Sequence, residues 1–286
     1  MVRSLTNHAL LIACLTSAWL GFSTEPTQAE EGFDSLFNGR DLTGWDGDPR
    51  FWSVEDGAIT GRTKGPDDLD YNRFLILKDQ RFSNFVLRVR FRLEGDNNSG
   101  IQYRSLHLPN SGDHVVKGYQ ADINARPEYT GMLYDERGRG ILAERGQQVF
   151  IAKNGKKNVT YEAPKGAALN LEEWHELEIT AFGNRLTHRL DGNVIVDVID
   201  GETAEAEAAG LIALQIHRGP AMKIQFKDIR IARFPDRPGQ FQPSQSVPRQ
   251  AAQNPARRNF GRKFQPQLPR GQNPSGLQLD PSPSPD

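Results

Sequence analysis

The chain has 286 residues, of which 37% are hydrophobic and 25% charged, and its formal net charge is −1. This length and composition allow one large buried core or two small ones. Residues 31–234 carry a net charge of −4, because residues 1–30 carry −1 and residues 235–286 carry +4, so nothing in this core predicts nucleic-acid binding.

The N-terminus has the pattern of a secretory signal. Arg3 precedes an apolar run over residues 9–22, and a polar stretch then leads to the small-residue site at residues 27–29. We predict that residues 1–29 are a signal peptide and that the protein is extracytoplasmic, either periplasmic or secreted. Residues 11–14 also resemble a lipoprotein cleavage box, so lipid anchoring through Cys14, the single cysteine, is the alternative.

The central region is predicted to be almost entirely β. In residues 85–94, FVLRVRFRLE, every second residue from Phe85 to Leu93 is apolar, and Arg88, Arg90 and Arg92 lie on the opposite face, as in a half-buried strand. Six further segments show strand patterns, two of them with turns at Asp56-Gly57 and Asp191-Gly192: residues 51–62, 100–105, 118–124, 175–183, 185–199 and 222–234. Many short strands without a helical period predict one two-sheet antiparallel β-sandwich, or jelly roll, over residues 31–234.

Three of the predicted strands carry polar side chains on the face away from the core. In residues 210–219, GLIALQIHRG, Gln215 and His217 oppose a row of aliphatic side chains. The same alternation places Gln120 with Asp122, and Gln102 with Arg104. Amides, an acid, a guanidinium and an imidazole match the paired donor and acceptor character of hydroxyl groups. These faces predict a binding site for a polar ligand, although each residue alone could be an exposed polar side chain.

The C-terminal segment, residues 235–286, holds 11 of the 18 prolines and many glutamines, with no periodic apolar pattern. We predict a disordered basic tail, which could contact an acidic polymer or be a solvated extension. Residues 138–143 fit the pattern G-x-G-x-x-A, but no helical pattern follows, so no nucleotide cofactor is expected.

The sequence resembles the 3-keto-disaccharide hydrolase domain family over residues 33–234. The segments that carry this resemblance are SLFNGRDLTGW (35–45), NSGIQYRS (98–105), GYQADI (118–123), TGMLYDERGRG (130–140), EEWHELEITAFGNRLTHRLDG (172–192) and IALQIHRGPAMKIQFKDIRI (212–231). The resemblance implies a concanavalin A-like jelly roll, an extracytoplasmic location, and action on glycosides whose sugar carries a 3-ketone. It also implies a pocket lined by Arg104, Gln120, Asp122, Tyr134, Gln215 and His217.

One departure from the family concerns the strand that begins GY. The family usually has a glutamate and then a glutamine two residues later, whereas this chain has Gln120 and then Asp122. The acid and the amide are exchanged, which moves the carboxylate along the strand at about 3.3 Å per residue.

A 3-keto sugar needs less catalytic machinery than an ordinary glycoside, because the ketone acidifies the neighbouring C–H bond and the aglycone can leave by β-elimination. Asp122 or His217 is the expected base and Arg104 the charge-stabilising donor, while Gln120, Gln215 and Tyr134 orient hydroxyls. A divalent cation on Asp122 and His217 could replace Arg104. The expected partner is an oligosaccharide or glycoside substrate; the alternative function is a non-catalytic carbohydrate-binding module.

Overall fold

A computed structural model describes residues 32–166 and 168–235. The predicted signal peptide at residues 1–29 lies outside the described residues, as does the predicted tail at residues 235–286 apart from Pro235. The described part contains strands and three short 3-10 helices but no α-helix, which confirms the all-β prediction. The 3-10 helices are η1 (Pro66–Asp68), η2 (Pro109–Ser111) and η3 (Pro127–Tyr129). No helix in this part has the length and apolarity needed to cross a membrane.

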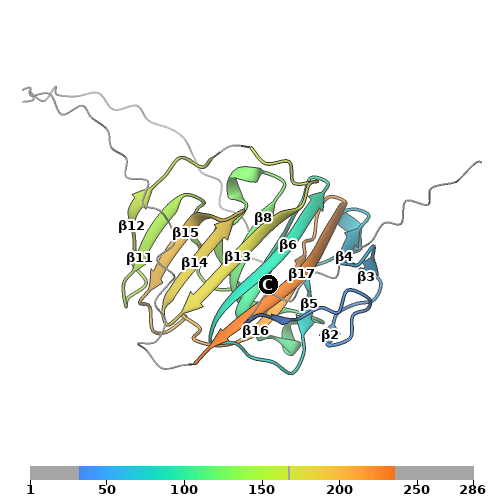
Figure 1. Cartoon of the computed structure of the whole chain (residues 1–286), viewed down its shortest axis with the longest axis horizontal. Helices are drawn as coiled ribbons and strands as arrows, with labels where there is room; N and C mark the ends of the chain where they lie inside the picture. The colour runs from blue at the N-terminus through green and yellow to red at the C-terminus, as the bar shows by residue number, and fades with distance from the viewer. Residues whose placement is uncertain (1–31, 167, 236–286) are drawn as a thin grey trace, which may run out of the picture. The chain divides into compact units, whose positions relative to one another are not determined.

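The strands form two sheets, which we call sheet A and sheet B (Figure 1). Among the described residues, sheet A is 10-stranded, with the order β12-β11-β15-β14-β13-β6-β17-β4-β3 and with β1 paired to β17. Its pairs are antiparallel apart from β11 and β15, which run parallel. The strands of sheet A are β1 (Asp34–Ser35), β3 (Trp52–Glu55), β4 (Ala58–Thr63), β6 (Asn84–Glu94), β11 (Gln147–Ile151), β12 (Lys157–Glu162), β13 (His175–Phe182), β14 (Arg185–Leu190), β15 (Asn193–Asp200) and β17 (Met222–Phe234).

Sheet B is 7-stranded within the described residues and has the order β10-β9-β8-β7-β16-β5-β2. It brings the three strands with polar faces side by side, because β7 lies between β8 and β16. The strands of sheet B are β2 (Trp45–Asp46), β5 (Arg73–Leu77), β7 (Asn98–His107), β8 (Val116–Asn124), β9 (Leu133–Glu136), β10 (Gly140–Ala143) and β16 (Leu211–Ile216).

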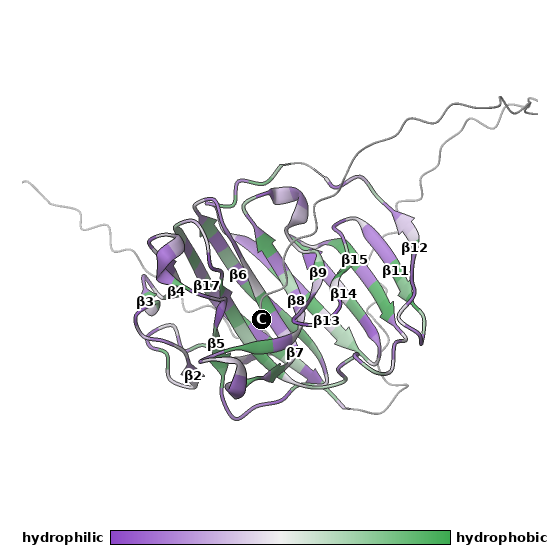
Figure 2. Cartoon of the chain, turned by 180° about the vertical axis from the view of Figure 1, so that it is seen from behind, coloured by the Kyte–Doolittle hydropathy of each residue, from purple (hydrophilic) through white to green (hydrophobic). Residues whose placement is uncertain are grey.

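The core lies between the two sheets. The alternation predicted for β6 is confirmed, since its apolar side chains from Phe85 to Leu93 are buried and take part in the main hydrophobic cluster. Sheet B contributes Ile101, Tyr103 and Ile212 to the same cluster. Figure 2 shows the resulting pattern, in which hydrophobic and hydrophilic residues alternate along the strands. Burial of these apolar faces is what holds the sheets together.

A loop covers part of the outer face of sheet B, the face turned away from sheet A. The loop joins β7 to β8, and directly after it Val116, the first residue of β8, packs with Phe74, Ile76 and Ala213. The Phe74 amide donates a hydrogen bond of 3.0 Å to the carbonyl of His114, which ties the loop to β5. This outer face is therefore a second, smaller layer of packing and not a plain solvated surface.

Strand β12 forms the edge of sheet A and is exposed along its whole length. It pairs with β11 over Gln147 to Ile151, with a register shift after Gln148. Val159 and Tyr161 are exposed on it, and charged side chains stand at both of its ends. Charges and irregular pairing are common devices that keep an edge strand from pairing with another chain.

Candidate functional site

The register of sheet B brings most of the predicted polar residues onto one outer face. Gln102 lies opposite Gln120, which lies opposite Tyr134 on the other side. Asp122 lies opposite Gly100, and β16 runs along the far edge of β7 with Gln215 on the same face. Side chains two residues apart share a face, so Gln120 and Asp122 point the same way. The sequence prediction that these residues share one face is confirmed.

The amides and the acid form one hydrogen-bonded network. Gln102 Nε2 donates to Gln120 Oε1 at 2.8 Å, and Gln120 Nε2 donates to Asp122 Oδ1 at 2.8 Å and to Gln215 Oε1 at 3.4 Å. Ser105 Oγ completes the chain by donating to Gln102 Oε1 at 2.7 Å. The four amide and acid side chains belong to residues that are at most 2% exposed. Buried polar groups are stable when they are paired in this way.

Gly100 makes this network possible. The side-chain amide of Gln120 lies across the backbone of β7, where the Cβ of any other residue at position 100 would stand, with Gln120 Nε2 only 2.7 Å from that point. Real Cβ atoms do not approach other atoms so closely. The missing side chain therefore lets Gln120 reach Asp122 on its own strand and Gln215 two strands away.

Asp122 is the most perturbed acid of this face. Burial raises the pKa of its carboxyl from the ordinary 3.8 to about 7, against the lowering effect of hydrogen bonds from Gln120 and Asn124 and with a smaller raising contribution from the charge of Glu136. A carboxyl with a pKa near 7 can both accept and release a proton at neutral pH. The exchange of acid and amide relative to the family places this acid within direct hydrogen-bonding distance of Gln120.

Glu136 is a residue of this face that the sequence analysis missed. It lies on β9 opposite Gly118, two residues beyond Tyr134, and is 9% exposed. Its pKa is raised, first by burial, and the Asn72 side chain hydrogen-bonds to it. The signal was present in the sequence as the alternation of Tyr134 and Glu136 in the segment LYDE, but the strand is too short to show a period on its own.

His217 follows directly after the end of β16 and is half-buried. Burial lowers the pKa of its imidazole, so the ring is neutral at neutral pH. Its Nδ1 lies 2.5 Å from the carbonyl of Arg218, and a carbonyl can only accept. Nδ1 therefore carries the proton, and Nε2 keeps its lone pair as an acceptor.

Tyr134 is half-buried beside the same network. Burial raises the pKa of its phenol, and the charges of Glu136 and Asp122 raise it further. The hydroxyl therefore keeps its proton at neutral pH and can serve as a hydrogen-bond donor.

Arg104 is a correction to the predicted site, because its side chain does not join the polar network. The strand β7 has a register shift between Tyr103 and Leu106, and Arg104 itself has a positive φ of 47°. This bulge turns the side chain toward sheet A, where Nε donates to the Ser83 carbonyl at 2.7 Å and Nη1 to the Gly183 carbonyl at 2.8 Å. Strict alternation fails at a bulge, since one extra residue reverses the direction of the next side chain.

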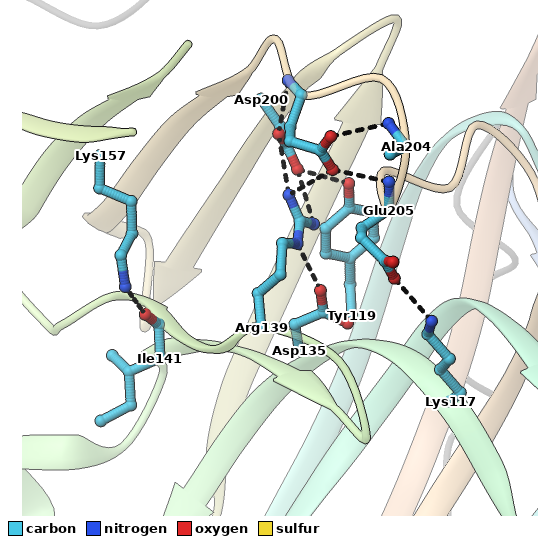
Figure 3. Close-up of polar contacts among 10 residues, drawn as sticks. Lys117, Tyr119, Asp135, Arg139, Ile141, Lys157, Asp200, Ala204 and Glu205 are labelled. Atoms are coloured by element: carbon cyan, nitrogen blue, oxygen red, sulfur yellow. Dashed lines mark hydrogen bonds and ion pairs between the residues drawn. The ribbon is translucent and has the colours of Figure 1, made fainter. Parts of the chain in front are cut away.

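The Arg104 side chain lies beside a cavity of about 580 Å³. Tyr119 and Asp200 also line this cavity. Tyr119 donates to Asp200 Oδ2 at 2.7 Å, and Arg139 Nη1 donates to Asp200 Oδ1 at 3.1 Å (Figure 3). Arg139 Nε also lies 2.6 Å from Asp135 Oδ2. This ion-pair network joins β8, β9 and β15, and so connects the two sheets.

The divalent cation considered for Asp122 and His217 stays a prediction. Among residues 32–166 and 168–235, no three or more His, Cys, Asp and Glu side chains gather in a way that could hold a metal. Asp122 and His217 provide two ligands at most, and protein metal sites commonly use three or more. No step proposed for this site passes through a metal.

Several solved structures are similar to this chain at low identity. A candidate glycosyl hydrolase from Parabacteroides distasonis ATCC 8503 is 20% identical, with 72% of this chain and 95% of that chain covered and a TM-score of 0.48. The carbohydrate-binding module CBM66 from Bacillus subtilis is 17% identical, with 66% and 95% covered and a TM-score of 0.44. A search of curated proteins found no match. Structural likeness at these values says nothing about reaction or ligand.

The family comparison is more informative. The model of the 3-keto-alpha-glucoside-1,2-lyase-like domain matches residues 32–232, which is most of the chain and nearly all of the two-sheet domain. The match confirms the resemblance inferred from the sequence segments, and it supports a role related to carbohydrates. The chain belongs to the family of 3-keto-alpha-glucoside-1,2-lyase-like domains.

Proposed function

We propose that this protein cleaves glycosides whose sugar carries a 3-ketone, by β-elimination at the outer face of sheet B. The observation that carries the proposal is Asp122, a buried carboxyl with a pKa of about 7 that lies in a network of amides. Family membership supports the choice of a glycoside as substrate. The extracytoplasmic location expected from the N-terminal sequence is part of the same proposal.

The proposed reaction begins with removal of the proton on C2, next to the ketone at C3. Asp122 takes this proton, and the electron pair of the C2–H bond forms the C1–C2 double bond. The bond from C1 to the aglycone oxygen breaks, and its electron pair leaves with that oxygen, which then takes a proton. Water can add to the unsaturated product afterwards, so that the net result is hydrolysis. A base with a pKa near the working pH is the most efficient choice.

Two further groups support the chemistry. Gln215 Nε2 is buried and finds no hydrogen-bond acceptor among the described residues, so it is a donor available to the ketone oxygen as negative charge develops there. This donor fills the role that the sequence analysis gave to Arg104. His217 Nε2 is free to act as an acceptor, because Nδ1 carries the proton, and His217 is the alternative base.

The test is to incubate the purified full chain with a 3-keto-β-glucoside or 3-keto-trehalose and to follow aglycone release by mass spectrometry, with and without EDTA. The unoxidised glycosides are tested alongside. We expect release from the 3-keto substrates only, unaffected by EDTA, and a loss of about 100-fold or more in Asp122→Asn. Asp96→Asn, on the exposed turn before β7, is the matched control and should retain activity.

The variants separate the two candidate bases. If Asp122 is the base, His217→Ala retains part of the activity and Asp122→Asn does not; the reverse order assigns the base to His217. Loss of release on addition of EDTA would establish a cation that the side chains do not predict. Saturable binding of unoxidised glycans without any release would reject the lyase proposal and establish the carbohydrate-binding module instead.

A further inference from the structure

We propose that the outer face of sheet A, the face turned away from sheet B, binds the carboxylate groups of an acidic polysaccharide. The binding site is a group of cations around one tryptophan, which we call the Trp174 cluster: Arg90, Arg92, Lys227 and Trp174. It is formed by β6, by β17 and by the residue directly before β13, and both of these other strands pair with β6 (Figure 1). The inference does not depend on the proposed cleavage reaction, which takes place on sheet B.

The register of sheet A brings the members of the Trp174 cluster together. On β6, Phe91 belongs to the core, so Arg90 and Arg92 on either side of it point outward. Lys227 lies opposite Arg90 on β17. Trp174 directly precedes β13, whose first residue lies opposite Phe91. The indole ring therefore lies beside the outward row of β6.

The three cations approach the indole ring closely. Lys227 Nζ lies 4.2 Å from the centroid of the Trp174 ring. The central guanidinium carbons of Arg92 and Arg90 lie 5.0 and 6.0 Å from it. A cation at such a distance over an aromatic ring is attracted to its negative face. The ring therefore holds the cations near one another in advance, which reduces the entropy lost when an anion binds them.

The Trp174 cluster carries more positive than negative charge. Its only ion pair among the described residues joins Arg90 to Asp228 at 3.7 Å, and both side chains are exposed. Arg92 Nε donates to the uncharged side chain of Gln225 at 2.7 Å. Burial lowers the pKa of Lys227, and the charges of Arg90 and Arg92 lower it further. Three cations beside one acid leave a net charge of about +2, which a bound anion would offset.

The charged side chains around the cluster are already used. On β6, β13, β14 and β17 they form ion pairs of 2.8 to 3.3 Å: Arg88 with Glu178, Arg189 with Glu178, Arg230 with Glu176, and Lys223 with Glu94. Two exposed glutamates, Glu172 and Glu173, precede Trp174 in the chain. The Trp174 cluster is therefore a small positive patch with carboxylates along its border.

Such a patch favours a partner whose negative charges are widely spaced. Duplex DNA carries one charge per about 1.7 Å of its axis, so it would press phosphates against the bordering carboxylates as well as against the cations. The net charge of −4 on residues 31–234 also opposes a dense polyanion or an anionic membrane. A polysaccharide with one carboxylate per sugar avoids this conflict, and a guanidinium can bind a carboxylate through two parallel hydrogen bonds. The role related to carbohydrates that the family supports agrees with this partner.

The test measures binding of the full chain to polygalacturonate by isothermal titration calorimetry at low ionic strength. Methyl-esterified polygalacturonate is the uncharged probe. The cluster variant combines Arg90→Gln, Arg92→Gln and Lys227→Gln. We expect it to bind polygalacturonate about tenfold more weakly than wild type, at about twofold per exposed charge contact, and we expect no binding of the esterified polymer. Removal of like charges relieves repulsion, so this variant should fold.

A control variant separates the cluster from net charge. It removes three cations from exposed ion pairs elsewhere, by Arg62→Gln, Lys165→Gln and Arg185→Gln, and should bind within about threefold of wild type. The basic segment 235–286 is present in every variant, so its contribution is common to all. Trp174→Leu keeps the charge but removes the ring that gathers the cations, and it should weaken binding about threefold.

Each other outcome overturns the proposal. Equal weakening in the cluster and control variants would assign the binding to net charge, and equal binding of the esterified polymer would remove the carboxylates from it. No binding of polygalacturonate by wild type would overturn the partner. Tighter binding to duplex DNA or to phosphatidylglycerol vesicles, lost in the cluster variant, would replace the polysaccharide by a nucleic acid or a membrane.

Discussion

Replacing Asp122 by asparagine should change how stability depends on pH. The carboxyl has a pKa of about 7 in the folded protein against an ordinary 3.8, a difference of about 3 pKa units. At about 1.4 kcal/mol per pKa unit, ionising this buried group reduces the free energy of unfolding by about 4 kcal/mol. Asparagine has nearly the same shape and cannot ionise, so this reduction is absent in Asp122→Asn.

The sign follows from which state holds the proton. Between pH 3.8 and about 7 the folded protein keeps the proton of Asp122 while the unfolded chain has lost it, so the free energy of unfolding falls as the pH rises. Above about pH 7 both states are ionised and the effect is constant. We therefore expect wild type to lose about 4 kcal/mol relative to Asp122→Asn between about pH 4 and pH 8.

The quantity to measure is the difference in the free energy of unfolding between wild type and Asp122→Asn. His188 also makes stability depend on pH, but in the opposite direction. Burial lowers the pKa of His188 from 6.5 to about 4, so the unfolded chain binds that proton first and stability falls as the pH falls from about 6.5 toward 4. This contribution is common to both proteins and cancels in the difference. Urea unfolding followed by tryptophan fluorescence, at half-unit steps of pH, gives both curves.

A difference that stays constant across this pH range would refute the reasoning, since it would mean that Asp122 ionises in the folded protein as easily as in the unfolded chain. Asp96→Asn, on an exposed turn, is the control for the aspartate-to-asparagine substitution itself.

Three further substitutions test the packing around the site. Tyr103→Phe removes the hydroxyl that lies 2.9 Å from Nε2 of buried His188 and should cost about 1–3 kcal/mol in urea unfolding. Arg139→Met leaves two buried carboxylates without their cation and should cost about 3–5 kcal/mol by the same measurement. Gly100→Ala should displace the Gln120 amide and reduce aglycone release while the far-UV circular dichroism spectrum stays that of wild type.

Each of these expectations has an outcome against it. A Tyr103→Phe protein of unchanged stability would show that the imidazole finds another partner. A fully active Gly100→Ala protein would show that the position of the Gln120 amide does not matter for the reaction. A stable Arg139→Met protein would mean that the carboxylates are hydrated or protonated at little cost.

The sequence predicts the fold well because the strands that contribute most to the core are long enough to show a clear alternation of apolar residues. Strand β6 shows five apolar positions in strict alternation, and all five are buried. The bulge at Arg104 could not be predicted, because nothing in the segment YRS distinguishes a regular strand from one that turns at a positive φ. One such residue was enough to move a predicted site residue to the other side of the sheet.

The sequence predicted which types of residue form the site, but it did not predict how they are arranged in space. Alternation shows which side chains of one strand share a face, and so it grouped Gln120 with Asp122. It does not show which strands are neighbours, and the presence of Glu136 on the same face becomes visible only when β9 is known to pair with β8. The special role of Gly100 likewise appears only when the opposite strand is known.

The exposed edge strand β12 has a consequence for the motions of the protein. Its residues contribute almost nothing to the core, and its only described strand partner is β11. Detaching β12 therefore breaks a few hydrogen bonds without exposing the apolar interior, so its amide hydrogens should exchange with deuterium much faster than those of the central strands β6 and β17. The domain can fray at this edge while the opposite sheet, with its buried network of amides and acids, stays closed.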